Sequence, residues 1–168
     1  MGTAYYSTVL DHDVGTTWSL IRDFNNYPVY IDGVSESVIE DGRSGDEVGA
    51  VRRFCYKGAW IRQRLSAHSD DRRTLTYAGL EPFPFPAGVV DETLPPSHYE
   101  GTIRLLPVID GARTFIEWSV TVDAAPEHAA SWQALLMALI PDWTSSLRAT
   151  LDRQVPATPR SGPAIPVR

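Results

Sequence analysis

The feature that most constrains the fold is a change of period near the C-terminal end of the chain. Most of the preceding sequence has the two-residue alternation of β-strands, whereas residues 126–153 have a helical period. Pro126 suits the first turn of a helix. One face of this helix recurs every three or four positions, as Trp132, Leu136, Leu139, Trp143, Leu147 and Thr150. A single long amphipathic helix must therefore pack on a sheet built by the residues before it.

The rest of the pattern predicts a strand, two short helices and six further strands. Residues 4–11 form the first strand, and Asp11 or Asp13 can cap a helix with Val14, Trp18, Ile21 and Phe24 on its apolar face. A short helical turn is expected at residues 27–31. The later strands are expected at residues 34–40, 48–56, 60–68, 74–80, 98–108 and 114–122. One helix cannot cover seven strands by close packing alone, so a cavity between helix and sheet is the natural result.

Composition excludes several classes of protein. The net charge is −6, and the 15 Lys and Arg residues never form a run longer than two, so we expect no nucleic-acid partner. Cys55 is the only cysteine, which excludes an internal disulfide and favours a reducing, cytoplasmic compartment. No apolar run approaches the roughly 18 to 20 residues of a membrane span, so stable membrane insertion is not expected. The sequence suggests no cofactor and no metal, and either a monomer or a homodimer.

Two regions are rich in proline and interrupt the pattern. Residues 81–96 contain five prolines and cannot form a central strand, so we expect an ordered loop there. Residues 154–168 are also proline-rich and are predicted to be a disordered tail. The expected domain therefore covers residues 1–153.

Alternation sorts the strand residues into two faces. If the apolar phase faces the helix, Trp118 points inward and Glu117 outward. The same rule turns a further set inward: Ile61, Gln63, Leu65, Ala67, Leu75, Tyr77, Gly79, Tyr99, Gly101, Ile103 and Leu105. It sends Arg62 and Arg64 out. The opposite register of residues 60–68 would instead bury both arginines, at a high cost without carboxylate partners.

Five segments carry a resemblance to a known superfamily: TTWSLIRDFNNYPVY (16–30), DEVGAVRRF (46–54), DDRRTLTY (70–77), HYEGTIRLLPV (98–108) and TFIEWSVTVDAAP (114–126). Together they resemble the SRPBCC superfamily, also called START-like. Its members include polyketide aromatase/cyclases, lipid-transfer START domains, plant abscisic-acid receptors and birch-pollen-allergen-like proteins. The resemblance implies the helix-grip fold of the α+β class. In that fold a curved, seven-stranded antiparallel sheet surrounds a long C-terminal helix, and two short helices follow the first strand.

The resemblance also implies which other residues line the cavity. It favours Phe54 and Tyr56 as lining residues, with Arg52 deeper, and places gates at residues 57–60 and 81–98. In the second gate, Phe83 and Phe85 either cap the cavity mouth or only cover the rim of the sheet. From the helix we expect Trp132, Leu136 and Ile140 to complete the substrate-binding set, which also contains Gln63, Leu65, Gly79, Gly101 and Trp118.

The candidate chemistry is limited to polar groups that converge in an apolar space. Tyr56, Gln63, Tyr77 and Tyr99 could orient a ligand carbonyl or hydroxyl. Tyr99, Tyr77 and His98 are the candidate catalytic residues, acting as acids or bases. In the alternative, each tyrosine is a core residue bonded to a neighbour, and His98 is a solvated loop residue.

Three functions follow from these residues and the resemblance. The first is a polyketide cyclase/dehydratase-like protein, a lyase or isomerase, which acts on a hydrophobic oxygenated substrate by acid–base positioning without a cofactor. The second is a non-catalytic carrier or sensor of a lipid-like or aromatic ligand. The third is a START protein similar to coenzyme-Q chaperones or to toxin–antitoxin members. In each case the expected partner is a hydrophobic small molecule.

Overall fold

The computed structural model describes residues 1–84, 94–95 and 97–154. Phe85 and the predicted tail beyond Gln154 lie outside the described residues. The elements follow one another as β1 (Gly2–Leu10), α1 (Val14–Ile21), α2 (Tyr27–Tyr30), β2 (Val34–Ile39), β3 (Val51–Tyr56), β4 (Ala59–Ser69), β5 (Thr74–Gly79), β6 (Tyr99–Val108), β7 (Arg113–Val122) and α3 (Pro126–Gln154). This is the predicted order of strand, two short helices, six strands and long helix.

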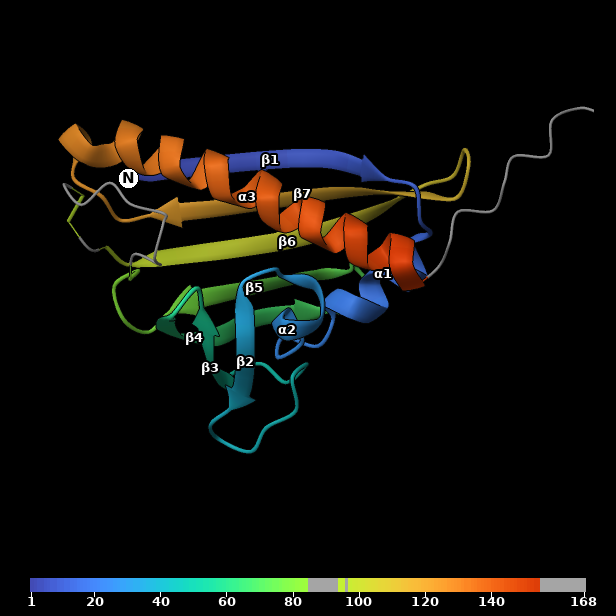
Figure 1. Ribbon diagram of the computed structural model, residues 1–168, viewed down its shortest axis with the longest axis horizontal. Coiled ribbons are helices and arrows are strands. Elements are labelled where there is room, and N and C mark those ends of the chain that lie inside the picture. The colour runs from blue at the N-terminus through green and yellow to red at the C-terminus, as the bar shows by residue number, and fades with distance from the viewer. Residues whose placement is uncertain (85–93, 96, 155–168) are drawn as a thin grey trace, which may run out of the picture.

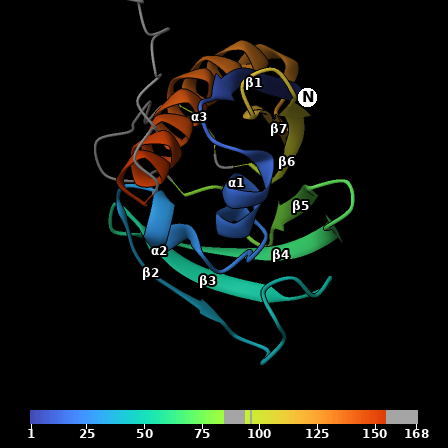
Figure 2. The same ribbon diagram turned by 90° about the vertical axis from the view of Figure 1, so that its right-hand side faces the viewer.

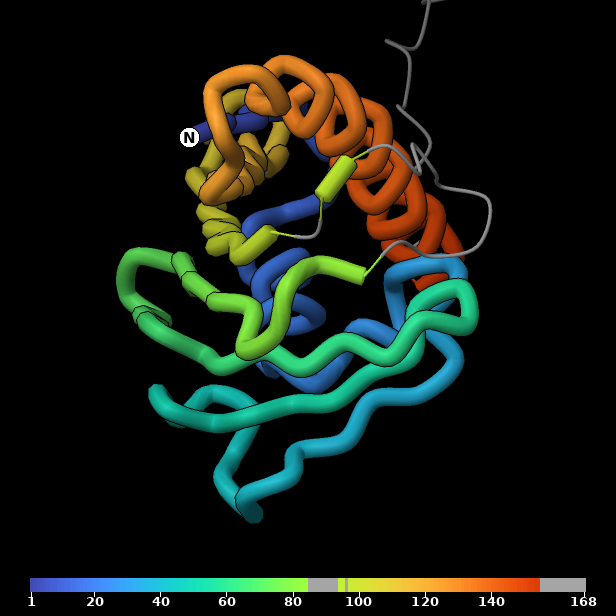
Figure 3. The backbone as a smooth tube through the Cα atoms, turned by 90° about the vertical axis from the view of Figure 1, so that its left-hand side faces the viewer, coloured from blue at the N-terminus to red at the C-terminus, as the bar shows by residue number. Residues whose placement is uncertain are grey.

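The strands form one antiparallel sheet in the order β1-β7-β6-β5-β4-β3-β2. The sheet curves strongly, so that β1, β7 and β6 face α3 from one side while β2, β3 and β4 form the opposite floor (Figure 2; Figure 3). The helices α1 and α2 connect the two edge strands and close one end of the curve (Figure 1). The predicted helix-grip fold is confirmed.

The long helix α3 runs along β1 and β7 and buries one face against the sheet (Figure 1). That face contains Trp132, Leu136, Ile140, Leu147 and Leu151, each less than 2% exposed. Burial of a side chain of this size contributes roughly 1.5 to 3 kcal/mol, so α3 is held mainly by packing. No helix in the described part of the chain is long and apolar enough to cross a membrane.

Local sequence fixes the ends of several elements. Asp13 caps α1, because its carboxylate accepts hydrogen bonds from the backbone N–H and the hydroxyl of Thr16. Between β3 and β4, Lys57 and Gly58 both have positive φ, at 46° and 81°. A two-residue hairpin turn with both residues in this region matches the twist of the strands. This turn sets the register of β3 and β4 on the floor of the sheet.

The structure corrects two details of the predicted strands. Strand β3 begins at Val51 rather than at residue 48, because Gly49 has a φ of 96° and the N–H of Ala50 turns back to the carbonyl of Glu47. The pairing of β4 with β5 shifts between Leu65 and Ala67. This bulge reverses the alternation, so Ala67 is exposed rather than inward.

Candidate functional site

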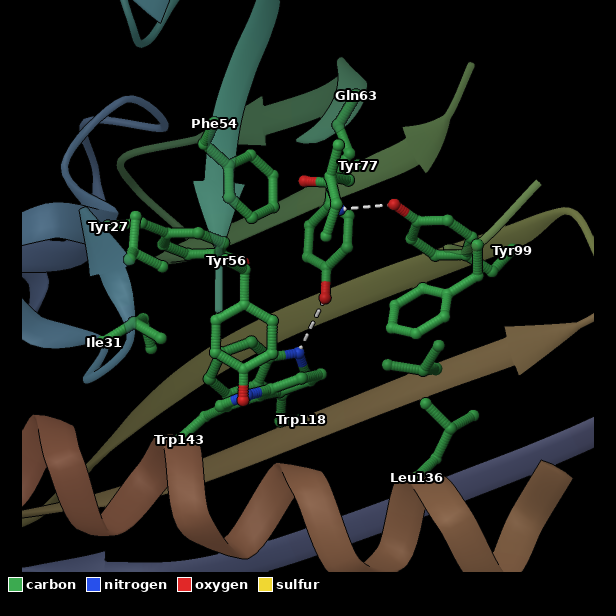
Figure 4. Close-up of a pocket in the computed structure, with 14 residues that line it drawn as sticks. Tyr27, Ile31, Phe54, Tyr56, Gln63, Tyr77, Tyr99, Trp118, Leu136 and Trp143 are labelled. Atoms are coloured by element: carbon green, nitrogen blue, oxygen red, sulfur yellow. Dashed lines mark hydrogen bonds between the residues drawn. The ribbon is translucent and has the colours of Figure 1, made fainter. Parts of the chain in front are cut away.

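A cavity lies between the concave face of the sheet and α3 (Figure 4). Its walls are almost entirely apolar and come from α2, six strands, the loop after β5 and α3. They leave about 30 Å³ open to the centre of a water-sized sphere. A site for one water needs roughly 10 to 15 Å³ by this measure, so the open space suits about two waters. The lining residues are Tyr27, Ile31, Val34, Phe54, Tyr56, Ile61, Gln63, Tyr77, Phe83, Tyr99, Trp118, Val120, Leu136 and Trp143.

Tyr77 stands on β5 and crosses the cavity toward β7. Its hydroxyl accepts a hydrogen bond of 3.0 Å from the indole Nε1–H of Trp118 (Figure 4). The ring lies flat over Gly101 of β6, where an added Cβ would be 2.2 Å from the Tyr77 Cζ. Glycine at this position is therefore required for the ring to reach Trp118.

Tyr99 of β6 is held by a hydrogen bond as well, in this case from Gln63 on β4. Its hydroxyl accepts a hydrogen bond of 2.8 Å from the Nε2–H of Gln63 (Figure 4). Gly79 makes room for this ring, because a Cβ there would be 2.4 Å from the Tyr99 Cε1. Phe83 contacts Tyr99 edge-on at 5.2 Å between ring centroids, which places this loop residue in the cavity wall.

Arg52 lies behind Gln63 and is only 1% exposed. Its Nε–H and Nη2–H donate to Gln63 Oε1 at 3.1 and 2.5 Å, and its Nη1–H donates to the carbonyl of Phe24. The guanidinium also stacks on the rings of Tyr27 and Phe24, at 3.6 and 3.9 Å from their centroids. None of its partners among the described residues is a carboxylate.

Tyr56 and Trp143 form a partition at one end of the cavity. The Nε1–H of Trp143 donates to the Tyr56 hydroxyl at 3.1 Å. Both side chains also line an open groove of about 410 Å³ on the outer surface, beside Lys57 and Asp142. The narrow inner cavity and the wide outer groove therefore share one wall made of two hydrogen-bonded aromatic residues.

Burial fixes the protonation state of two phenols in the cavity. Desolvation raises the pKa of Tyr77 well above its ordinary value, and it raises the pKa of Tyr99 in the same way. Both hydroxyls therefore keep their protons at neutral pH. They can donate hydrogen bonds, but they are poor general bases.

The structure brings most of the predicted site residues to one place. Phe54, Tyr56, Gln63, Tyr77, Phe83, Tyr99, Trp118 and Leu136 line the cavity. A second group is buried immediately around these residues: Arg52, Leu65, Trp132 and Ile140, with Gly79 and Gly101 under the tyrosine rings. Arg62 and Arg64 lie outside, as the apolar phase of β4 predicted.

His98 is the member of the predicted catalytic set that does not line the cavity. Its side chain is exposed just before β6, one residue before the inward-facing Tyr99. Alternation therefore directs His98 away from the cavity. Its role as an acid or base stays a prediction from the sequence.

Sequence reasoning missed several residues of the wall. Tyr27, Ile31 and Val34 come from α2 and the start of β2, and Val120 and Trp143 complete the far side. Val120 lies two residues after Trp118 on β7, so the alternation of the strand could have identified it as inward-facing. The contribution of α2 depends on how the sheet curves, which alternation does not describe. Within the described ranges, no group of three or more His, Cys, Asp or Glu side chains could hold a metal ion.

Comparison with known proteins agrees with this geometry. A family described as "Polyketide cyclase / dehydrase and lipid transport" matches residues 1–155. No curated protein matches the chain. Among solved structures, a protein from Nitrosospira multiformis has 26% identity, covers 88% of this chain and 94% of its own, and has a TM-score of 0.66.

Two further structures share the fold at lower identity. A START superfamily protein from Mycobacterium smegmatis has 11% identity and a TM-score of 0.70, over 92% of this chain and all of its own. The di-domain ARO/CYC BexL from the BE-7585A biosynthetic pathway has 11% identity and a TM-score of 0.71. That match covers 90% of this chain and 47% of BexL.

Proposed function

Because this chain belongs to the polyketide cyclase/dehydrase and lipid transport family, we propose that it binds a hydrophobic, oxygen-bearing small molecule between α3 and the concave sheet. One observation carries the proposal. Tyr56, Tyr77, Tyr99 and Gln63 bring hydroxyl and amide groups to a cavity whose described lining is otherwise largely apolar. A few fixed polar groups in an apolar enclosure are typical of a small-molecule site.

A ligand must enlarge the inner cavity, because sites for small molecules usually measure about 300 to 1,000 Å³. The partition of Tyr56 and Trp143 is the point where this costs least. One hydrogen bond and an edge-on ring contact at 6.2 Å join the pair, Trp143 also packs on Trp118 at 5.3 Å between ring centroids, and Trp143 is only half-buried. Rotation of the pair would join the inner cavity to the outer groove, which adds about 410 Å³.

Catalysis of the cyclase/dehydratase type is the second candidate, and the contacts of Tyr99 favour it. Gln63 links the Tyr99 hydroxyl to the buried charge of Arg52. A phenol that accepts such a hydrogen bond is a better donor to a substrate oxygen on which negative charge develops. Among the described residues, the cavity lining contains no carboxylate, histidine or lysine, so this chemistry would rest on proton donation by tyrosine.

Binding is tested with menadione, a hydrophobic naphthoquinone, by quenching of tryptophan emission. Saturable quenching is expected because Trp118 and Trp143 line the cavity. Leu136→Phe, which fills the cavity from α3, should weaken binding at least about 10-fold. Met137→Phe is the matched control, because Met137 is the next residue and is 37% exposed. Quenching without saturation, or equal affinity in both variants, would contradict the proposal.

A further inference from the structure

Three of the four tyrosines that line the cavity, Tyr56, Tyr77 and Tyr99, share one property: each hydroxyl accepts its hydrogen bond from a group that can only donate. For Tyr77 and Tyr56 the donors are the indole N–H groups of Trp118 and Trp143. An indole has no acceptor atom, so these two bonds cannot reverse. The phenolic protons of Tyr77 and Tyr56 must therefore point elsewhere.

At Tyr99 the direction of the hydrogen bond is determined by Arg52, through the orientation of Gln63. A guanidinium can only donate, so the atom of Gln63 that faces Arg52 must be the oxygen. The other end of the same amide, the Nε2–H₂ group, then faces Tyr99 and donates to its hydroxyl. Arg52 thus sets the orientation of Gln63, and Gln63 sets the polarity of Tyr99.

The three phenolic protons have no acceptor among the described residues, because each hydroxyl takes part only in the bond that it accepts. Tyr5 on the convex face is different, since its hydroxyl donates to Glu117 at 2.7 Å. A buried donor without an acceptor is costly, so an incoming acceptor oxygen is strongly favoured. Gln63 Oε1, the only side-chain amide oxygen in the described part of the lining, already accepts twice from Arg52.

We infer that the cavity selects its ligand by hydrogen-bond polarity: it takes hydrophobic compounds with ketone- or quinone-type oxygens and rejects compounds whose polar groups are N–H donors. The inference rests on the proposed function, because it specifies the ligand of the same cavity. A carbonyl oxygen accepts from the phenolic protons that are present. At Tyr56, Tyr77 and Tyr99 an N–H group meets phenol oxygens that already accept a hydrogen bond, so the loss of its hydration is poorly compensated there.

Three bicyclic probes of nearly equal shape separate these cases: 1-indanone has one acceptor, indole has one donor, and indane has neither. Their dissociation constants are to be measured by isothermal titration calorimetry on the full chain. We expect 1-indanone to bind about 10-fold more tightly than indane, as one good hydrogen bond provides. Indole should bind no better than indane.

Gln63→Glu reverses the polarity at Tyr99 while it keeps the size of the side chain. The new carboxylate accepts from both Arg52 and Tyr99, so it takes up the phenolic proton that a ligand would use. We expect the preference for 1-indanone over indane to fall about as far as it does in Tyr99→Phe. Tyr5→Phe is the control, since it removes a phenol from the convex face and should leave the preference unchanged.

The outcomes separate the inference from the proposed function. If none of the probes binds, the proposed function fails and the inference fails with it. If indole binds as tightly as 1-indanone, the cavity exists but the inference about its polarity is wrong. If 1-indanone is preferred and Gln63→Glu retains that preference in full, the assignment of the Tyr99 proton is wrong.

Discussion

The two faces of the sheet use the same residue types in opposite ways. On the convex face, Arg62 pairs with Glu40 at 2.7 Å and with Glu81 at 3.4 Å, and Tyr5 donates to Glu117. On the concave face, Arg52 has neutral partners, and the cavity tyrosines accept hydrogen bonds instead of donating them. These convex-face donors all have carboxylate acceptors, whereas the phenolic protons on the concave face have no acceptor among the described residues.

This difference is the basis of the proposed ligand specificity, since the described residues of the cavity wall include no carboxylate, lysine, arginine or histidine. On the convex face, water screens each ion pair and can solvate both partners, so these pairs contribute little to stability. Inside, each donor without an acceptor costs free energy until a ligand supplies the acceptor. The concave face is therefore organised around hydrogen-bond polarity, and the following predictions test how strongly it depends on that organisation.

The largest effect is expected from Arg52→Ala. This change leaves Gln63 Oε1 and the Phe24 carbonyl without their donor and opens a cavity beside three aromatic rings. Two unsatisfied buried acceptors and the lost packing together predict a loss of about 3 kcal/mol or more in the free energy of unfolding. Urea denaturation measures this directly.

Arg62→Ala is the matched control on the convex face. Its side chain is 40% exposed and pairs with carboxylates that water can solvate, so no measurable change is expected. Equal losses of unfolding free energy in Arg52→Ala and Arg62→Ala would show that the two faces depend on their arginines to the same extent.

The second effect concerns the room that glycine leaves for the cavity tyrosines. Gly101→Ala places a Cβ 2.2 Å from the Tyr77 ring, which must then leave its position and its bond with Trp118. We expect a loss of about 1 to 3 kcal/mol in the free energy of unfolding, together with loss of menadione binding. In Gly15→Ala the nearest non-neighbouring atom is the flexible Asp13 carboxylate at 3.2 Å, so this control should affect neither. Retained binding in Gly101→Ala would contradict the assigned position of Tyr77.

Much of this arrangement follows from the sequence, because period and alternation depend on local residue order. The helical period of residues 126–153 predicted α3, and the apolar phase of β5 and β6 placed Tyr77 and Tyr99 on the concave face. Alternation failed at Ala67, where a bulge reverses the phase of β4. A bulge adds one residue to one strand, and nothing in the composition around Leu65 marks it.

The contacts between distant elements could not be predicted. The bond between Trp143 and Tyr56 joins α3 to β3 across 87 positions of sequence, and it depends on the curvature of the whole sheet. The sequence also does not show that the described partners of Arg52 are neutral, because the nearest acids along the chain, Glu47 and Asp46, pair with Arg43 and Arg22 instead. Hydrogen-bond polarity therefore emerges only from the folded structure.

The third effect is a loss of stability in alkali. Burial raises the pKa of Tyr77 and Tyr99, so above pH 10 the unfolded chain loses protons that the native state keeps. Stability should then fall as the pH rises, by about 1.4 kcal/mol per pH unit for each such tyrosine. Tyr99→Phe should reduce this slope by one proton in guanidinium denaturation between pH 8 and pH 11.

Tyr5→Phe tests the convex face under the same conditions. The pKa of Tyr5 is also raised, because its hydroxyl donates to Glu117, but the side chain is half exposed and screened by water. If Tyr5→Phe changed the dependence of stability on pH as much as Tyr99→Phe does, burial of the phenol would not be the cause of the loss of stability in alkali.

The smallest effect is expected at Asp70, where an indole donates to a charged acceptor at the rim of the sheet. Asp70 accepts from Trp18 Nε1–H at 2.8 Å and from two N–H groups of Arg22 at 3.0 and 2.9 Å. Arg22 first, and then Trp18, hold the pKa of Asp70 well below its usual range. A lowered pKa contributes stability above the unfolded value of about 4, and this contribution is lost as the pH falls.

Asp70→Asn should therefore cost at most about 1 kcal/mol at pH 7, because the Asp70 side chain is 54% exposed and its ion pair is screened. The difference from wild type should shrink as the pH falls below about 4, since the unfolded wild-type chain then binds a proton that the native carboxylate, with its lowered pKa, still excludes. Tyr77→Phe is the internal counterpart, because it removes the neutral acceptor of Trp118 and its cost should not change over this range. A cost of Asp70→Asn that is also independent of pH would show that the charge of Asp70 does not stabilise this contact. The hydrogen bonds of the two tryptophans, Trp18 at the rim and Trp118 in the cavity, would then not differ in kind.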